Sequence, residues 1–209
     1  MAEVGILGED DYVELIEGQI IDKSSQPIGR RRFTVEEYYR MAEAGILRED
    51  ERVELIEGEI LEMSPIGRRH AACVARLDDL LQQKTRGKFL IWPQNPVQLN
   101  DLSKPQPDIA ILKKRKDYYA GLNPAPANVL LIVEVADTTV QNDRTVKAPL
   151  YARAGIPEVW LVDLPGEAVE IYARPEQGEY QTRLTLKRGE SIISPTISGL
   201  SFSVESVLG

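Results

Sequence analysis

The sequence predicts an α/β protein with a core in the order helix, three-stranded meander, helix, strand. Hairpins are added on its N-terminal side, and a β-hairpin follows the core toward the C-terminus. Two observations predict this class: apolar, β-prone runs alternate with segments of helical spacing, and the last core helix lies between two apolar strands, as in a βαβ unit. At 209 residues and 43% hydrophobic composition, the chain is long enough to bury a large core.

The N-terminal third contains an internal repeat. Residues 5–31 return with few changes as residues 45–69, and both copies contain the stretch VELIEG. The Glu57-Gly58 pair between two β-prone runs predicts a hairpin or a bulge in the second copy. One repeated unit is too short for a solenoid. Only the second copy leads directly into the core, so we expect residues 1–32 to form a duplicated hairpin arm and residues 33–209 to form the main domain.

Two helices are predicted around the second copy. Thr34, followed three residues later by Glu37, is a capping-box pattern for a helix that ends near Gly45. The segment 70–83 has helical spacing. Its predicted apolar stripe consists of Ala72, Val74 or Ala75, Leu77, Leu80 and Leu81. Residues 88–101 then form a proline-bounded strand, which is expected at a sheet edge or as the first strand.

The next strands are predicted at 108–112 and 129–136, where Asp108 begins the first and Glu134 lies near the end of the second. The helix after them contains Pro149, which predicts a kink or an irregular turn, and it ends near Gly155. A strand over 158–164 completes the βαβ unit. Strands over 167–173 and 180–186 form the expected hairpin, and residues 197–209 form a closing strand or short helix.

Composition limits the functional classes. The net charge of −8 argues against nucleic-acid binding through bulk electrostatics, so such binding would need local basic patches. The single cysteine, Cys73, excludes an internal disulfide and a cysteine-rich metal site, and it suits a reducing cytoplasm. No apolar run approaches the roughly 20 residues of a membrane span, and the acidic N-terminus lacks the basic start of a secretory signal. We therefore expect a cytoplasmic protein that has no membrane partner.

Asp108 and Glu134 are the leading functional candidates. A carboxylate inside an aliphatic strand is costly to bury unless another group pairs with it. Two carboxylates that can be reached from one sheet edge are typical of a metal site. Read singly, Asp108 is also compatible with an ordinary strand start, and Lys147 is also compatible with a solvated helix position.

Several motifs occur together in order: VELIEGEILEMSP, the following His70, QPDIAIL, LLIVEVADTT and DRTVKAPLYARAGIPEVWLVDL. This ordered set, from about Phe33 to the C-terminus, resembles the bacterial family of putative restriction endonucleases in the PD-(D/E)xK nuclease superfamily. The resemblance implies a restriction-endonuclease-like core and a Mg²⁺-dependent or Mn²⁺-dependent endonuclease that hydrolyses DNA phosphodiester bonds.

The resemblance also implies roles for individual residues. Asp108 and Glu134 would bind the metal together with the main-chain carbonyl of Val135. The lysine usual two positions after Glu134 is replaced by Ala136, and Lys147 on the next helix is the substitute that we expect to lie near the attacking water.

Two further residues are candidates for the catalytic site. Glu54 is the implied acidic residue of the N-terminal hairpin. Glu57 is the alternative, because its side chain would point to the opposite face of the strand. His70, the only histidine, is a candidate for binding the scissile phosphate or an outer-shell water.

Two other functions remain open from the sequence. Ala136 and the acidic net charge favour a nuclease-fold protein without catalysis that binds nucleic acid or protein. A metal-free acid/base pair of Asp108 and Glu134, as in glycosidases, is the third possibility, and Lys147 argues against it. The duplicated hairpin is a self-compatible strand unit, and it predicts sheet extension or a homodimer.

Overall fold

The computed structural model describes residues 4–8, 11–24, 29–48 and 50–209, which divide into two compact units. The first unit comprises residues Met1–Met63 and Leu99–Pro105, and the second comprises Ser64–Gln98 and Gln106–Gly209. Each unit has its own arrangement of strands and helices.

The first unit holds copy one of the repeat and the hairpin of copy two. In copy one, β1 (Val13–Ile16) and β2 (Gln19–Asp22) form an antiparallel hairpin, and β3 (Gly29–Arg30) pairs with β2. In copy two, β4 (Val53–Ile56) and β5 (Glu59–Glu62) form the matching hairpin. The VELIEG stretch therefore forms the same hairpin in both copies, whereas Gly29-Arg30 forms β3 and the equivalent Gly67-Arg68 begins α2.

The hairpin predicted at Glu57-Gly58 is present, and both residues have positive φ, 50° and 83°. Two consecutive residues with positive φ are characteristic of the tight turns that match strand twist. A Cβ atom on Gly58 would lie 2.6 Å from the Cβ of Arg32, so no larger residue fits at this position.

Helix α1 (Val35–Glu43) lies between the two hairpins and begins with the predicted capping box. The Thr34 hydroxyl accepts a hydrogen bond from the Glu37 amide at 3.2 Å, and the Glu37 carboxylate accepts one from the Thr34 amide at 2.7 Å. These contacts satisfy two backbone groups that a helix start otherwise leaves unpaired. The unit's core contains Ile6, Phe33, Val35, Met41 and Leu55.

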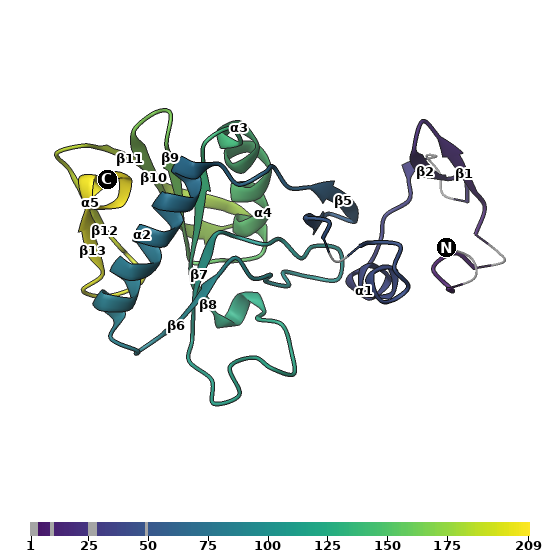
Figure 1. Ribbon diagram of the computed structural model, residues 1–209, viewed down its shortest axis with the longest axis horizontal. Helices are drawn as coiled ribbons and strands as arrows, with labels where there is room; N and C mark the ends of the chain where they lie inside the picture. The colour runs from purple at the N-terminus through teal and green to yellow at the C-terminus, as the bar shows by residue number, and fades with distance from the viewer. Residues whose placement is uncertain (1–3, 9–10, 25–28, 49) are drawn as a thin grey trace. The chain divides into compact units, whose positions relative to one another are not determined.

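The second unit contains a six-stranded sheet in the order β11-β10-β9-β8-β7-β6 (Figure 1). Strands β8 (Val129–Ala136) and β9 (Glu158–Asp163) are parallel, and every other neighbouring pair in this sheet is antiparallel. The remaining strands are β6 (Leu90–Pro93), β7 (Ile109–Leu112), β10 (Ala168–Glu176) and β11 (Glu179–Lys187). The mixed sheet confirms the predicted α/β fold class, and β6 is an edge strand as expected.

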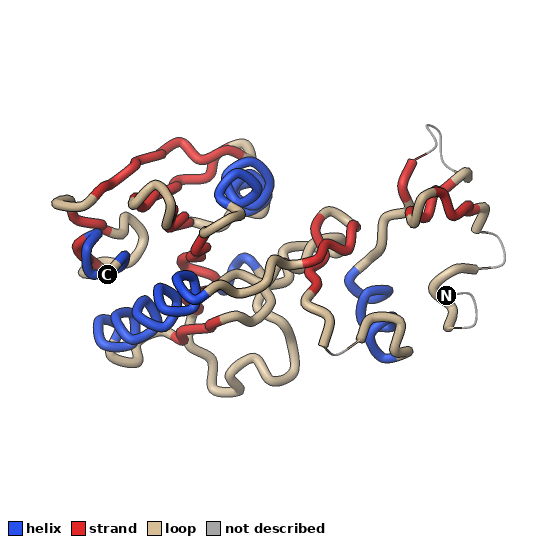
Figure 2. Tube along the Cα trace, turned by 45° about the horizontal axis from the view of Figure 1, so that its top comes forward, coloured by secondary structure: helices blue, strands red, loops and turns tan. Residues whose placement is uncertain are grey.

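Helices lie on both faces of this sheet. Helix α2 (Arg68–Thr85) and helix α5 (Val204–Leu208) pack against one face, where Val133, Val135 and Trp160 point inward. Figure 2 shows α2 and α5 as neighbouring blue segments, and α5 follows the short hairpin of β12 (Ser191–Ile193) and β13 (Ser201–Ser203). Because side chains alternate along a strand, Glu134 points toward the opposite face.

The buried stripe of α2 differs in part from the prediction. Val74, Leu77 and Leu81 are buried as expected, but Ala72 and Ala75 are exposed, and Cys73 takes an inward position. Cys73, Leu77 and Leu81 follow one another at four-residue spacing, which keeps them on one face of the helix. The prediction placed Ala72 on the buried face of α2, whereas the structure has the Cys73 side chain there.

Between β8 and β9 the chain forms α3 (Val140–Asn142), a π-turn over Asp143–Lys147, and α4 (Ala148–Arg153). A short 3₁₀ turn (Pro126–Asn128) precedes β8. Pro149 explains the irregularity that the sequence predicts, since its ring clashes with the carbonyl four residues earlier in a regular α-helix. The wider turn accommodates the proline: the Ala148 amide bonds the carbonyl of Asp143, five residues back.

The carboxyl of Glu158 is completely buried at the start of β9. It accepts hydrogen bonds from Trp160 Nε1 and Ser194 Oγ, both at 2.6 Å, and from the Thr196 amide at 3.1 Å. Burial raises the pKa of Glu158 above its usual 4.5, and the hydrogen bonds offset part of this effect. The side chain thereby ties the loop after β12 to the sheet.

This raised pKa gives a stability prediction. A folded-state pKa above the unfolded value favours folding fully below pH 4.5, and that contribution is lost as pH rises through the folded pKa. The free energy of unfolding of the wild type, relative to Glu158→Gln, should therefore fall as pH increases above 4.5. Urea unfolding of both proteins across pH 4.5–8 measures this difference, and a difference that grows with pH would contradict it.

Candidate active site

Asp108 immediately precedes β7, and Glu134 lies near the end of the adjacent strand β8. Strands β7 and β8 are antiparallel with Ile109 opposite Val133, so continuing the register by one residue places Asp108 opposite Glu134. The Val135 amide donates a hydrogen bond of 2.8 Å to Asp108 Oδ2. Two residues distant in the sequence are thus held together by the pairing of two buried strands.

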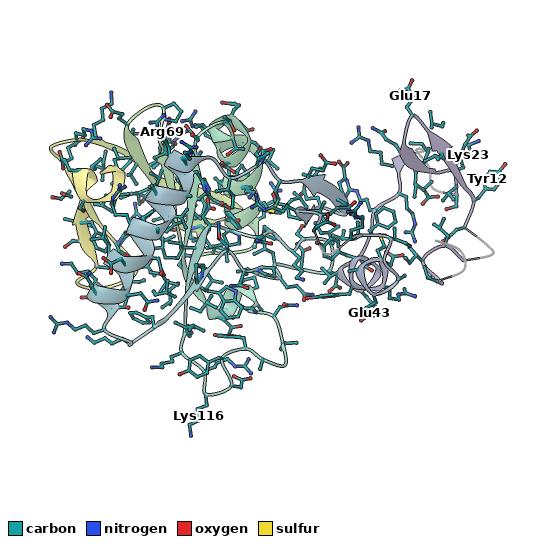
Figure 3. All side chains as sticks on the ribbon, viewed as in Figure 1. Tyr12, Glu17, Lys23, Glu43, Arg69 and Lys116 are labelled. Carbon is teal, nitrogen blue, oxygen red and sulfur yellow. The ribbon has the colours of Figure 1, made fainter. Side chains whose placement is uncertain are left out.

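His70 approaches Asp108 from the first turn of α2. Its Nε2 lies 2.9 Å from Asp108 Oδ1, and both side chains are largely buried. The preceding residue fixes the start of the helix, because Arg69 Nη2 donates to the Leu164 carbonyl at 3.1 Å and Nη1 to Asp137 Oδ1 at 3.5 Å. Figure 3 shows Arg69 at the end of α2 where the helix begins. His70 is therefore held beside the carboxylate by the ends of β8 and β9.

Lys147 and Tyr151 reach Glu134 from the helical segment between β8 and β9. Lys147 Nζ lies 3.4 Å from Glu134 Oε1, and the Tyr151 hydroxyl donates a hydrogen bond of 2.6 Å to the same oxygen. Glu134, Lys147 and Tyr151 are all buried. Residues four apart on a helix lie on one face, so one face of this segment supplies both groups.

The carboxylates of Asp108 and Glu134 are hard oxygen donors, as Mg²⁺ and Mn²⁺ prefer. Each carboxylate oxygen has two acceptor positions, so one hydrogen bond to it leaves room for a metal ion. Within the described ranges, no group of three or more His, Cys, Asp or Glu side chains is arranged to hold an ion. Magnesium keeps several waters and needs only one or two carboxylates, so Asp108, Glu134 and the Val135 carbonyl form a chemically suitable set.

The other predicted positions have distinct surroundings. Ala136 is fully buried in β8 opposite Asp163 of β9, at the position where the resemblance expects lysine. Glu54 is buried on β4 in the first unit, whereas Glu57 is exposed in the turn that follows. His70, Asp108, Glu134 and Lys147 belong to the second unit, and the role of Glu54 stays a prediction.

Cys73 lies one turn after His70 on α2, but its thiol has low reactivity. Burial raises the pKa of its thiol to about 11, and its Sγ contacts the Val207 carbonyl at 3.4 Å. Metal binding and nucleophilic attack both require the thiolate, which is scarce at neutral pH when the pKa is this high. The chemistry of the site therefore falls to the carboxylates, the lysine and the histidine.

A comparison with models of known protein families shows which family this chain belongs to. A model of the family Uma2, described as "Putative restriction endonuclease", matches residues 35–205. The chain belongs to the Uma2 family. The match covers most of the chain, and it confirms the family that the ordered motifs indicate.

One solved structure supports the fold of this Uma2 chain. A putative nuclease from Anabaena variabilis ATCC 29413 superposes with a TM-score of 0.69 at 16% identity, covering 84% of this chain and 97% of that one. The type IIG restriction endonuclease BpuSI gives a TM-score of 0.39 at 19% identity, covering 70% of this chain and 16% of that one. No curated protein matches the Uma2 chain significantly. None of the helices in the described residues is long and apolar enough to cross a membrane.

The sequence analysis of this Uma2 protein missed Tyr151. The available signal was its spacing, because Tyr151 follows Lys147 by four residues on a predicted helix. A lysine expected to face a carboxylate implies that the residue one turn later faces it as well. Aromatic residues on such a helix usually belong to an apolar core, so spacing without coordinates did not separate the two roles.

Proposed function

We propose that this Uma2 protein is a metal-dependent endonuclease that hydrolyses DNA phosphodiester bonds, acting in the cytoplasm with Mg²⁺ or Mn²⁺. The observation that carries the proposal is that Asp108, Glu134 and Lys147 lie together at one end of strands β7 and β8. Membership of the putative restriction endonuclease family supports the same reaction. The single cysteine supports the reducing compartment.

Each side chain has a role in this reaction. Asp108, Glu134 and the Val135 carbonyl would hold the cation, which when bound lowers the pKa of water and offsets charge on the phosphate. Lys147 supplies a fixed positive charge beside Glu134 and orients the attacking water. His70 holds Asp108 in place and is available to contact the phosphate. The family resemblance alone implies Glu54 as a further acidic residue of the reaction, and this role stays a prediction.

A plasmid assay tests the proposal. Supercoiled DNA incubated with the protein should become nicked or linear in the presence of millimolar Mg²⁺ or Mn²⁺ and should stay intact in EDTA. The alternative, a binding module without catalysis, is motivated by Ala136 in the usual lysine position. Binding of DNA without cleavage under every metal condition would favour that alternative and contradict the nuclease proposal.

Tyr151 orients a metal ligand in this scheme, which gives a further prediction. Tyr151→Phe removes the donor to Glu134 Oε1 while leaving the ring and its packing in place. Loss of such an outer-shell contact typically costs about 10–100-fold in metal affinity or activity. Titration with Mn²⁺ should show weaker binding by the variant, and cleavage at saturating Mn²⁺ should be partly restored. Unchanged Mn²⁺ affinity would contradict this role.

We also propose that the protein is a homodimer held by the hairpin of copy one. Leu55 and Ile56 in copy two are 0% and 4% exposed, but the equivalent Leu15 and Ile16 in copy one are 71% and 46% exposed. In copy two the Lys104 amide bonds the Leu55 carbonyl at 2.7 Å in an isolated antiparallel bridge, so this strand edge pairs with another segment of the chain. The exposed edge and apolar side chains of copy one are suited to the same hairpin of a second chain.

The homodimer predicts a change in mass. Light scattering of the full chain should give a dimer, and deletion of residues 1–31 or the double change Leu15→Ser and Ile16→Ser should give a monomer with unchanged helix content. Because both side chains are exposed, the serine changes should leave folding intact. A full chain that is monomeric, or a serine variant that remains dimeric, would contradict this proposal.

A further inference from the structure

The second unit carries a concentration of positive charge remote from the carboxylates. Two short segments, 84–88 at the end of α2 and 113–116 after β7, are basic although the whole chain has a net charge of −8. We call their seven cations the basic end: Lys84, Arg86, Lys88, Lys113, Lys114, Arg115 and Lys116.

The fold brings these two segments together. Leu90 of β6 pairs with Leu112 of β7, so the residues before one strand and after the other lie side by side. Lys114 Nζ donates a hydrogen bond of 3.0 Å to the Gly87 carbonyl, which joins the segments directly. Figure 3 shows Lys116 pointing outward from the loop after β7. The basic end is therefore one surface built from two separate parts of the sequence.

Most of this charge is not neutralised. Arg115 pairs with Asp117 at 2.6 Å, whereas Lys113 Nζ donates a hydrogen bond of 2.7 Å to the Ala127 carbonyl. Across residues 4–8, 11–24, 29–48 and 50–209, no carboxylate forms an ion pair with the other six cations of the basic end. All of these six are exposed.

Helix stability explains only part of this arrangement. A helix C-terminus carries roughly half a negative charge, which favours cations such as Lys84 in the last turn and Arg86 and Lys88 just after it. The effect falls off within one turn, and it does not account for the basic segment 113–116 on a different element. Like charges held this close repel one another, and an anionic partner would relieve the repulsion.

We propose that the basic end binds the phosphate backbone of duplex DNA as an anchoring surface separate from the catalytic site. We name DNA as the partner because of the proposed nuclease function. The inference that the partner carries closely spaced phosphates rests on the seven cations of the basic end. Exposed lysine and arginine side chains in this arrangement contact phosphates and carry no base-sequence information.

The position of the basic end sets the minimum length of duplex DNA that can contact both this surface and the catalytic site. His70 lies in the first turn of α2 and Lys84 in its last turn, 14 residues later, so the helix separates the two sites by about 21 Å at 1.5 Å per residue. This length corresponds to roughly six base pairs at 3.4 Å each. A duplex that contacts both sites must therefore extend at least this far beyond the scissile bond.

Binding of a 30-base-pair duplex to the full-length protein in EDTA tests this inference without cleavage. The variant Lys88→Gln with Lys116→Gln removes two exposed charges that make no ion pair with a described carboxylate. Fluorescence anisotropy should show affinity on the order of tenfold weaker at low salt, and the slope of log K against log salt should fall by about 1.8, or 0.9 per phosphate contact.

The matched control is Arg174→Gln with Lys187→Gln, which removes the same charge from exposed positions on β10 and β11 at the far side of the sheet. The control should keep the affinity and salt slope of the wild type. Equal losses in both variants, or no loss in the Lys88/Lys116 variant, would overturn the inference. If the protein never cleaves DNA but only the Lys88/Lys116 variant loses binding, the nuclease proposal fails and the basic end stands.

Discussion

Asp108→Asn and Glu134→Gln should each lower DNA cleavage by at least about 10³-fold, because each removes one of two carboxylates proposed to hold the cation. The amides keep the shape of the side chains. Asparagine still offers an acceptor to the Val135 amide, and glutamine still offers one to the Tyr151 hydroxyl, so both variants should fold. Initial rates of plasmid cleavage at fixed Mg²⁺, with thermal unfolding in parallel, measure both effects.

Glu158→Gln is the matched control for these two variants. Glu158 is also a buried strand carboxylate, but it accepts its hydrogen bonds from Trp160, Ser194 and Thr196 on the sheet face covered by α2. Its amide variant should retain cleavage. Full activity in either Asp108→Asn or Glu134→Gln would refute the assignment of these residues.

Lys147→Met should reduce kcat by about 10²–10³-fold, the usual cost of removing one preorganised charge from a reaction site. Methionine fills most of the buried space that the lysine stem occupies, so the loss reports on the ammonium rather than on packing. Cleavage kinetics at saturating DNA and Mg²⁺ measure the change. Lys187→Met, an exposed change on β11, should leave kcat unaltered.

A second variant separates charge from position at Lys147. Lys147→Arg keeps the positive charge but replaces a compact ammonium with a larger planar group, so it should recover only part of the activity. Wild-type kcat in Lys147→Met would show that the lysine is not the substitute for the residue missing at Ala136.

Local patterns were sufficient to predict most elements of the second unit and the start of α1 in the first unit. The alternation of apolar runs predicted the strands, Pro149 predicted the irregular turn, and the capping pair at Thr34 and Glu37 predicted the start of α1. These features depend on neighbouring residues, which the sequence displays directly. The inward face of α2 was partly misassigned because helical spacing alone did not distinguish Cys73 from the nearby alanines.

Contacts between distant segments were harder to predict. The approach of Asp108 to Glu134 was expected from two acidic strand ends, but the bond from the Val135 amide depends on the strand register. The hydrogen bond from Tyr151 to Glu134 depends on which helix face packs on the sheet. The basic end depends on pairing of β6 with β7. Each is a non-local contact that residue spacing does not determine.

Direct measurement of metal binding gives the sharpest test of the central claim, that Asp108 and Glu134 share one cation. A crystal soaked in millimolar Mn²⁺ should show an anomalous peak within about 2.3 Å of one oxygen from each carboxylate. The peak should disappear in Asp108→Asn crystals soaked in the same way. Mn²⁺ bound elsewhere, or no Mn²⁺ beside these carboxylates in the wild type, would contradict the account.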